Sequence, residues 1–325
     1  MSFDRFAMLA CGLVLSVHAH AAAQRTFVST GGVDNPACSL VAPCRTFAGA
    51  IAATNAGGEV VVVDSGGYGP VTIAQSVTIV APAGVHAAVS IPGGGQGITT
   101  SPGTYDVTLR GLTLIGTGSA YGIRAQHDGS LTVERVSIEG AATGIAVTPP
   151  TGATVVLRDV ALRKGTDGIY VTRVTGTFTR VSADRFSSWA IYVSNGSTVA
   201  IDRATVSNAT GNGYGAIGGS ASGGAVTRLS VTESTISNVS AGIASADFGG
   251  TVLVEATGNA IIGAASAGLS AQGANATLIA SRNSVTRSNV GLQAGSGGTL
   301  ITFNDNSVVR NTLETSGVMT SAGYR

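Results

Sequence analysis

Apolar and polar positions alternate along this chain in a pattern that restarts every 22 to 26 residues, at a glycine followed by a branched aliphatic residue. Alanine replaces this glycine in two of the repeats. The pairs are Gly97-Ile98, Gly122-Ile123, Gly144-Ile145, Gly168-Ile169, Ala190-Ile191, Ala216-Ile217, Gly242-Ile243, Gly268-Leu269, Gly291-Leu292 and Gly317-Val318. A repeat of this length is typical of solenoids, in which each repeat buries its apolar side only against its neighbours.

Each repeat contains three short runs of alternating apolar and polar residues. In one repeat the first, second and third runs are Ile145–Val147, Val155–Leu157 and Val160–Leu162. Alternation with a period of two predicts β-strands, and runs this short do not predict helices. Three strands per turn, stacked about 4.8 Å apart in parallel ladders, predict a single-domain, all-β parallel β-helix.

The corner between the second and third runs carries a regularly spaced asparagine. Asn259, Asn283 and Asn306 each come just before a third run, one repeat apart. A sharp bend favours a residue that tolerates the left-handed backbone region. We therefore expect an asparagine stack inside the coil, with a structural role.

Composition is consistent with one elongated domain. The chain has 325 residues, of which 47 are glycine, only 11% are charged and 5% are aromatic, as suits a coil filled with small aliphatic side chains. No linker interrupts the repeat from Ile98 to Val318. The net charge is +1, and Lys164 is the only lysine among scattered arginines, so no nucleic-acid partner is predicted.

The first 23 residues have the pattern of a signal peptide. Arg5 precedes an apolar run from Phe6 to Val17, and Ala21-Ala22-Ala23 supplies small residues for cleavage before Gln24. The mature protein is therefore expected to be secreted or periplasmic. No later run reaches the roughly 18 apolar residues of a membrane helix, so no membrane span is predicted.

An N-terminal cap is predicted over residues 24–58, followed by the coil over residues 59–325. The cap contains Cys38 and Cys44, a close pair that predicts a disulfide in an exported chain. A metal site would need more ligands, and His86 and His127 are distant in sequence, so neither a metal nor a cofactor is predicted.

The same cap contains the one helix that the sequence predicts, over residues 46–53. Phe47, Ala50 and Ile51 fall on one face of it, and Gly57-Gly58 is expected to end it. Such a helix would cover the first turn of the coil, because the terminal repeats of a solenoid must shield both the core and the strand edge.

Several stretches resemble exported bacterial right-handed parallel β-helix proteins of the pectin-lyase-like group. They are Cys44–Ala48, Gly58–Val63, Pro70–Ile73, Ser76–Ile79 and Leu109–Leu114. The resemblance implies a right-handed coil over about residues 26–320. It does not imply one function, because this fold includes polysaccharide lyases, hydrolases, esterases, epimerases and adhesins.

The catalytic motifs of the enzymes in that group are absent from the chain. It lacks the Arg-x-Pro-x-x-Arg segment of pectate lyases, the Asn-Thr-Asp, Asp-Asp and Gly-His-Gly motifs of polygalacturonases, and the Asp-Pro-His motif of alginate epimerases. Its acidic residues do not align from repeat to repeat, although paired carboxylates or a calcium site would need them to converge.

One set of outward positions is rich in aromatic and charged residues. If the isoleucine of each pair points inward, the next residue points outward, and in four consecutive repeats these positions and those just before the glycine gather large side chains. They are Tyr121, Arg124, Asp167, Tyr170, Trp189 and Tyr192. Rings beside charged groups suit the binding of sugars, so these six residues form the predicted ligand-binding face.

The same residues allow two other interpretations. Tyr170 and Tyr192 could form an ordinary aromatic ladder on an exposed sheet, which contributes up to about 1 kcal/mol per pair. If the face were catalytic, Arg124 or Arg173 would act as the neutralising or proton-abstracting group of a β-elimination, with Tyr170 or Tyr192 as the proton donor. His127 is a weaker functional candidate, since His127-Asp128-Gly129 resembles a turn.

Three functional classes follow. The sequence favours an exported glycan-binding or surface-structural β-solenoid, with a polysaccharide lyase or hydrolase as the alternative and an adhesin or envelope scaffold as a third class.

The last turn has no evident cap. It is expected either to be folded over by Met319–Arg325 or to support self-association through its open edge.

Overall fold

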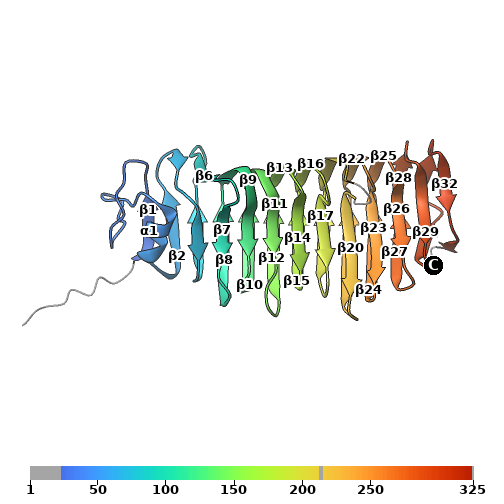
Figure 1. The fold of residues 1–325 in the computed structure, drawn as a ribbon, viewed down its shortest axis with the longest axis horizontal. Coiled ribbons are helices and arrows are strands. Elements are labelled where there is room, and N and C mark those ends of the chain that lie inside the picture. Colours follow the sequence, from blue (N-terminus) through green and yellow to red (C-terminus); the bar gives the residue numbers. More distant parts are fainter. Residues whose placement is uncertain (1–22, 212–214, 324–325) are drawn as a thin grey trace, which may run out of the picture.

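The computed structural model describes residues 23–211 and 215–323. The predicted signal peptide lies outside these residues except for Ala23, and its cleavage and the domain boundaries stay predictions. Figure 1 shows the strands stacked side by side along one long axis, with the cap at one end and the C-terminus at the other. No helix in the described part of the chain is long and apolar enough to cross a membrane.

The second runs form one continuous sheet of 13 parallel strands, here called the second-run ladder. Its strands, in spatial order, are β1 (Ala23–Val28), β2 (Thr54–Val62), β5 (Val77–Val80), β8 (Thr104–Arg110), β10 (Asp128–Glu134), β12 (Ala153–Arg158), β15 (Val174–Thr179), β18 (Thr198–Asp202), β21 (Val226–Thr232), β24 (Thr251–Thr257), β27 (Ala276–Ser281), β30 (Thr299–Phe303) and β33 (Met319–Ala322).

The third runs form a second parallel ladder, the third-run ladder. Its strands are β3 (Gly66–Gly67), β6 (Ala87–Ile91), β9 (Leu112–Ala125), β11 (Ser137–Val147), β13 (Ala161–Gly165), β16 (Ser182–Phe186), β19 (Thr205–Ala209), β22 (Thr235–Val239), β25 (Ala260–Ala264), β28 (Ser284–Thr286) and β31 (Ser307–Val309).

The first runs complete each turn as the first-run ladder. It contains β4 (Val71–Ile73), β7 (Gln96–Thr100), the second halves of β9 and β11, β14 (Asp167–Thr172), β17 (Ile191–Ser194), β20 (Ile217–Ser222), β23 (Ile243–Phe248), β26 (Ala267–Gln272), β29 (Val290–Gly295) and β32 (Leu313–Ser316). The predicted parallel β-helix with three strands per turn is confirmed. The last predicted pair, Gly317-Val318, is wrong, because Leu292 aligns with Thr315 and Val318 is exposed.

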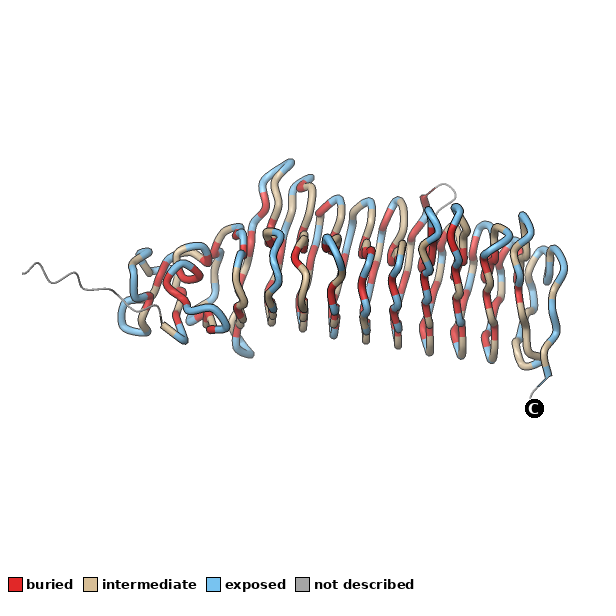
Figure 2. The backbone as a smooth tube through the Cα atoms, turned by 90° about the horizontal axis from the view of Figure 1, so that it is seen from below, coloured by how far each residue is buried: buried red, intermediate tan, exposed pale blue. Residues whose placement is uncertain are grey.

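The core is a column of aliphatic side chains inside the coil. Ile123, Ile145, Ile169 and Ile191 lie in register on consecutive strands and are fully buried. Figure 2 shows buried and exposed positions alternating along the turns. Burying each such side chain contributes about 1.5–3 kcal/mol. The core runs along the coil from Val28 to Leu300 rather than forming one compact centre.

The repeated glycine allows close approach between turns. A Cβ on Gly144 would lie 2.6 Å from the carbonyl oxygen of Gly168, and a Cβ on Gly242 would lie 2.2 Å from that of Gly268. Neither distance is open to a real side chain without a backbone shift. The regularly spaced glycine therefore marks the position where one turn contacts the next, and its spacing gives the length of the repeat.

The asparagine stack is confirmed, but its members do not adopt the left-handed backbone expected at the bend. The residues just before two of them, Gly258 and Arg282, do so with φ of 70° and 53°. The Asn259 Nδ2 donates to Asn283 Oδ1 at 2.9 Å, and the Asn283 Nδ2 donates to Asn306 Oδ1 at 2.9 Å. Asn259 and Asn283 are buried, and their Nδ2 atoms also donate to backbone carbonyl oxygens. The stack satisfies polar groups in the corner that would otherwise be buried without partners.

The predicted helix is confirmed as α1 (Phe47–Ala52), with Phe47, Ala50 and Ile51 buried against the first turn. The Thr46 Oγ1 accepts a hydrogen bond from the Gly49 backbone nitrogen at 2.9 Å, which caps the helix. The helix ends at Ala52 rather than at Gly57-Gly58, because the chain enters strand β2 at Thr54.

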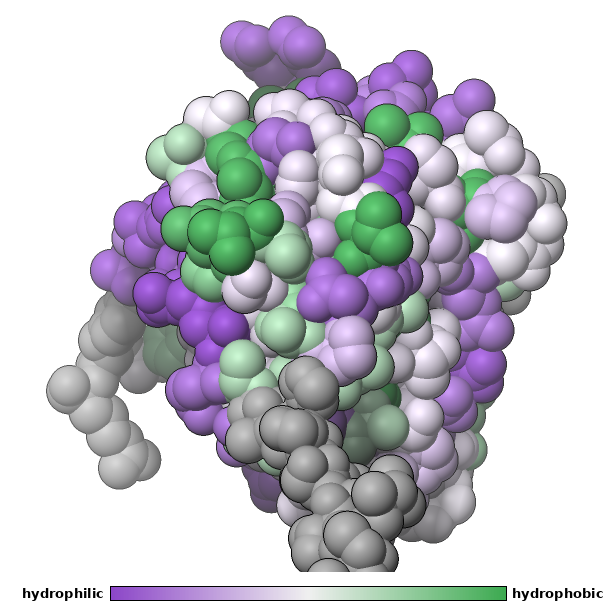
Figure 3. Space-filling model, turned by 90° about the vertical axis from the view of Figure 1, so that its left-hand side faces the viewer, coloured by the Kyte–Doolittle hydropathy of each residue, from purple (hydrophilic) through white to green (hydrophobic). Residues whose placement is uncertain are grey.

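Cys38 and Cys44 form the predicted disulfide. It closes a loop at the N-terminal end of the coil whose residues Leu40 and Val41 are exposed. Figure 3 shows this end of the molecule, where apolar side chains stand among polar ones. The disulfide therefore fixes the shape of a loop that has little core of its own.

Asp64 joins the first turn of the coil to Ser29 and Thr30 of the cap. Its carboxylate accepts hydrogen bonds from Ser29 Oγ at 3.0 Å, from the Thr30 backbone nitrogen at 2.9 Å and from Thr30 Oγ1 at 2.7 Å, and the Tyr68 hydroxyl also donates to it. The hydrogen bond from Tyr68, together with those from Thr30 and Ser29, lowers the pKa of Asp64 well below its usual value.

A lowered pKa in the folded state makes the contribution of Asp64 to stability depend on pH. That contribution is fully present above about pH 4, the pKa of an unfolded aspartate, and is lost as the pH falls further. We expect Asp64→Asn to lower the midpoint of thermal unfolding at pH 7, with the difference from the unmodified chain shrinking toward pH 3. A difference that does not change with pH would contradict this account.

The C-terminal segment does not fold over the last turn. Met319–Ala322 is strand β33, which pairs in parallel with β30 and so continues the coil. The expectation of a folded-over segment is wrong for these residues, because their alternating pattern fits one more strand of the ladder. Self-association through this edge stays a prediction.

Candidate functional site

The register of the first-run ladder brings the predicted binding residues onto one side of the coil. Arg124 pairs with Ala146, which pairs with Tyr170, which in turn pairs with Tyr192. One position before each glycine, Tyr121 aligns with Thr143 and Thr143 with Asp167. All six predicted residues are half-buried. We call this set, Tyr121, Arg124, Asp167, Tyr170, Trp189 and Tyr192, the aromatic face.

Three rings of the aromatic face stack on one another. The ring centroids of Tyr170 and Tyr192 lie 5.8 Å apart at an interplanar angle of 16°, and those of Trp189 and Tyr192 lie 5.2 Å apart at 20°. The Tyr192 hydroxyl is 2.5 Å from Ser220 Oγ. Tyr192 is therefore held between two other rings and supports Tyr170 from one side.

A glycine on the next strand makes room for Trp189. A Cβ on Gly218 would lie 2.4 Å from Cζ3 of the tryptophan ring, so the ring lies directly over this backbone. The Asp167 Oδ1 also accepts a hydrogen bond from the Trp189 backbone nitrogen at 3.3 Å. Small residues on later strands are thus part of the site, because they allow the large ring to lie flat.

On the other side of Tyr170 the face opens into a cavity of about 280 Å³. We call it the slot. Its lining residues come from β9, β11 and β14 and are Tyr121, Arg124, Thr143, Ala146, Thr148, Asp167 and Tyr170. Ala146 lies in register between Arg124 and Tyr170, so the slot exists because one strand carries a methyl group where its neighbours carry large side chains.

The walls of the slot carry polar groups without protein partners. The Arg124 guanidinium lies over the Tyr121 ring, with its Cζ 5.1 Å from the ring centroid, a cation–π geometry. No hydrogen bond or ion pair among the described residues uses the side chain of Arg124 or the hydroxyls of Tyr121 and Tyr170. These donors and acceptors remain available to a ligand.

Two other residues considered from the sequence lie elsewhere. Arg173 donates from Nε and Nη2 to the Pro149 carbonyl oxygen at 3.0 and 2.8 Å, and it lines a different cavity at another corner of the coil. Of the two arginines considered for catalysis, only Arg124 is on the aromatic face.

His127 is a structural residue. It is fully buried and stacks on Tyr105, with ring centroids 4.7 Å apart and an interplanar angle of 6°. Its Nε2 lies 3.1 Å from the Ser130 carbonyl oxygen, so Nε2 carries the hydrogen and Nδ1 accepts from the Thr100 hydroxyl at 2.7 Å. Both nitrogens are satisfied, and neither reaches the slot.

Sequence reasoning missed Thr143, Ala146 and Thr148 as slot residues. Ala146 follows Ile145 and so falls on an outward position, but its methyl group has no reactive chemistry, and Thr148 continues the same alternation two positions later. Among residues 23–211 and 215–323, no group of three or more histidine, cysteine, aspartate or glutamate side chains could hold a metal ion.

Comparison with known proteins establishes the fold. Residues 167–324 match the family model described as right handed beta helix region. A solved rhamnogalacturonan lyase aligns with 92% of this chain and 86% of its own, at 11% identity and a TM-score of 0.56. Pectate lyase Pel9A aligns with 91% of this chain and 79% of its own, at 16% identity and a TM-score of 0.52. No curated protein matches the chain in sequence.

The class of protein is therefore a right-handed parallel β-helix. Within that class, the chain has the pectin-lyase-like fold of the two lyase structures. Identities this low establish the fold alone, because proteins of one such fold perform unrelated functions. Function has to be argued from the slot.

Proposed function

We propose that the chain binds carbohydrate, with one sugar ring inserted in the slot between Arg124 and Tyr170. The observation that carries this proposal is the gap that Ala146 leaves between two large neighbours in register, walled by the Tyr170 ring and the Arg124 guanidinium. A pyranose offers an apolar ring face for stacking and hydroxyls at its edge, which match these two walls.

The dimensions of the ladder support a single inserted ring. Arg124 and Tyr170 are two strands apart, which corresponds to roughly 9–10 Å at the usual strand spacing. Planar groups stack at about 3.5–4 Å between their carbon atoms, so this interval holds one ring between the two walls. Thr143, Thr148 and Asp167 then lie where ring hydroxyls need partners.

Binding without cleavage is the favoured form of this function. Within the part of the chain that the structure describes, Asp167 is the only carboxylate that lines the slot, whereas most glycoside hydrolases use a pair of carboxylates. A β-elimination with Arg124 as base and Tyr170 as proton donor is the alternative, because both residues line the slot. It predicts that unsaturated sugar ends accumulate, whereas binding alone leaves the polysaccharide at its original length.

Export is part of the proposal. The signal-peptide pattern of residues 1–23 and the Cys38–Cys44 disulfide both favour an oxidising compartment, so we place the protein in the periplasm or outside the cell.

Tyr170→Ala is expected to weaken sugar binding about 30-fold, because truncating a central tyrosine of a binding site typically costs about 2 kcal/mol or more. The measurement is a screen of the purified chain on a glycan array, followed by calorimetric titration with the retained oligosaccharide and analysis of its length. Tyr192→Ala should weaken binding less, since Tyr192 acts only by supporting Tyr170.

Tyr105→Ala is a poor control because Tyr105 packs on His127. Tyr68→Phe, at the start of the coil and far from the slot, serves as the tyrosine control. If Tyr170→Ala does not change the retention of the glycan, Tyr170 and Tyr192 form an ordinary aromatic ladder and do not bind the sugar. No retention of any glycan would remove the proposed function.

A further inference from the structure

A larger groove lies around the corner from the slot, where the third-run ladder turns into the first-run ladder. Its volume is about 840 Å³, and its lining residues come from six consecutive strands of the third-run ladder, from Gly118 on β9 to Asn238 on β22. Six strands at the usual spacing span roughly 24 Å along the coil axis. We call it the corner groove. Its length suits an extended chain rather than a compact ligand.

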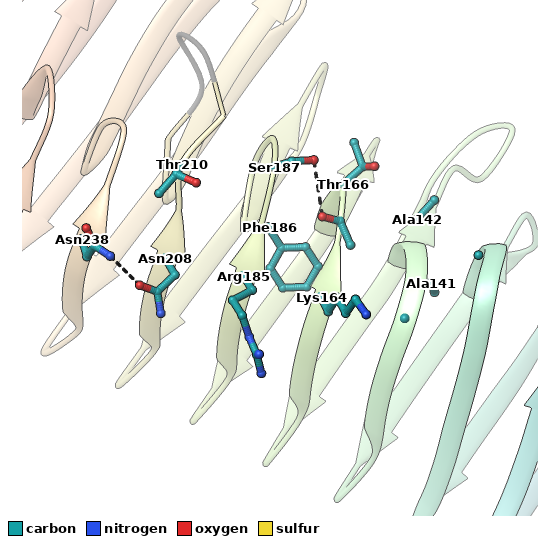
Figure 4. Close-up of a pocket in the computed structure, with 13 residues that line it drawn as sticks. Ala141, Ala142, Lys164, Thr166, Arg185, Phe186, Ser187, Asn208, Thr210 and Asn238 are labelled. Carbon is teal, nitrogen blue, oxygen red and sulfur yellow. Dashed lines mark hydrogen bonds between the residues drawn. The ribbon is translucent and has the colours of Figure 1, made fainter.

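The middle of the corner groove is cationic. Lys164 on β13 and Arg185 on β16 line it on neighbouring strands, beside the ring of Phe186, as Figure 4 shows. No ion pair of the described residues involves Lys164. No aspartate or glutamate among the described residues lines the groove.

The nearest carboxylate is already engaged by protein groups. Asp184 Oδ2 accepts from Arg185 Nε at 2.9 Å, and its Oδ1 accepts from Ser207 Oγ at 2.8 Å and Asn208 Nδ2 at 2.7 Å. The terminal nitrogens of Arg185 have no partner among the described residues. Two adjacent cations therefore keep donors free for an anionic ligand.

The rest of the corner groove is polar but uncharged. Thr166, Ser187 and Thr210 place exposed hydroxyls along it, and Asn238 Nδ2 donates to Asn208 Oδ1 at its far end. Phe186 is buried to 2% exposure and offers no open ring for stacking a nucleic-acid base. The groove also crosses the strands, so an extended peptide would find no unpaired strand edge along it. Hydroxyls, amides and a pair of cations instead match a carbohydrate with acidic groups.

We propose that the corner groove is a second carbohydrate site, which binds an unbranched acidic polysaccharide lying parallel to the coil axis, with Lys164 and Arg185 holding its anionic groups. This site is separate from the slot and does not depend on sugar binding there. Consecutive cations one strand apart, about 4.8 Å, lie close enough to bind acidic groups on the same or adjacent sugars.

The backbone offers conservative variants to test the site. Lys164 and Arg185 have positive φ angles of 59° and 61°, and the same column holds asparagine at Asn208 and Asn238, with φ of 54° and 52°. Asparagine tolerates this region, so Lys164→Asn with Arg185→Asn should keep the fold. Arg135→Asn with Arg282→Asn is the matched control. Both of these residues are exposed, have φ of 51° and 53°, and lie on a different corner.

The probe is an unbranched uronate octasaccharide, compared by calorimetric titration with the same octasaccharide after its carboxylates have been reduced to alcohols. We expect the unmodified chain and the control to bind the uronate form equally. The Lys164→Asn, Arg185→Asn chain should bind about tenfold more weakly for each cation removed, since charge-assisted hydrogen bonds contribute about 1.5–3 kcal/mol each. The reduced octasaccharide should bind weakly to all three.

Three results would overturn the second site. The unmodified chain could fail to bind the uronate octasaccharide, the control could lose as much affinity as the groove variant, or a single-stranded octanucleotide could bind through the same two residues as tightly. Tyr170→Ala should leave uronate binding to the groove unchanged, so failure of the slot and failure of the corner groove are distinguishable.

Discussion

Ala146→Leu is expected to abolish sugar binding in the slot while leaving the coil folded. Ala146 forms the base of the slot between Arg124 and Tyr170. Its side chain points outward but is only 2% exposed, so a leucine there fills the slot and displaces the side chains beside it without entering the core. Loss of the contacts of one buried ring corresponds to roughly 3 kcal/mol or more, or about a 100-fold weaker affinity. Calorimetric titration with the retained oligosaccharide measures it.

The matched control is Ala200→Leu. Ala200 is an exposed, outward-facing alanine on β18 of the second-run ladder, away from the slot. It should leave both affinity and thermal unfolding unchanged. Full affinity in a folded Ala146→Leu chain would mean that the sugar binds somewhere other than the slot.

Asn283→Leu is expected to have the largest effect on stability. The Asn283 Oδ1 accepts from the backbone nitrogen of Asn259 at 3.0 Å and from its Nδ2 at 2.9 Å, while its own Nδ2 donates to the Ala256 carbonyl oxygen at 2.8 Å and to Asn306 Oδ1 at 2.9 Å. Leucine leaves these buried groups without partners. At about 1–3 kcal/mol for each unsatisfied group, we expect a loss of about 3–5 kcal/mol in the free energy of unfolding.

Because turns of a solenoid contact only their neighbours, the loss should be local. Hydrogen exchange should rise first in strands β24, β27 and β30, and the urea midpoint should fall. Asn289→Leu is the control, since Asn289 is exposed and its side chain makes no hydrogen bond among the described residues. Equal destabilisation by both variants would show that the stack has no special role.

The repeat predicted the architecture because one physical constraint sets both. Close contact between turns favours glycine or alanine before the aliphatic residue, and that aliphatic residue points inward. The pairs from Gly97-Ile98 to Gly291-Leu292 therefore fix the register as well as the strands. The alignment of Arg124, Tyr170 and Tyr192 could be predicted because each residue directly follows the aliphatic residue of its repeat. The asparagine stack followed for the same reason, since its members are one repeat apart.

The details of the binding site could not be predicted from the spacing of the repeat, because they depend on the directions of the side chains and on the space between them. The Trp189 ring lies over Gly218 of the next strand, and the sequence pattern does not specify the direction in which this ring points. The slot arises from a small residue, Ala146, whose methyl group carries no reactive atom and so does not indicate a binding site in the sequence. The corner groove depends on the direction in which the Lys164 and Arg185 side chains project from residues with positive φ. In the sequence these two residues are only isolated basic residues.

A crystal structure of the chain with its retained oligosaccharide would show directly where the sugar binds. We expect one sugar ring between Arg124 and Tyr170, above Ala146, with hydroxyls within hydrogen-bond distance of the Arg124 guanidinium and the Asp167 carboxylate. An intact oligosaccharide bound elsewhere on the coil, with the slot unchanged, would contradict it.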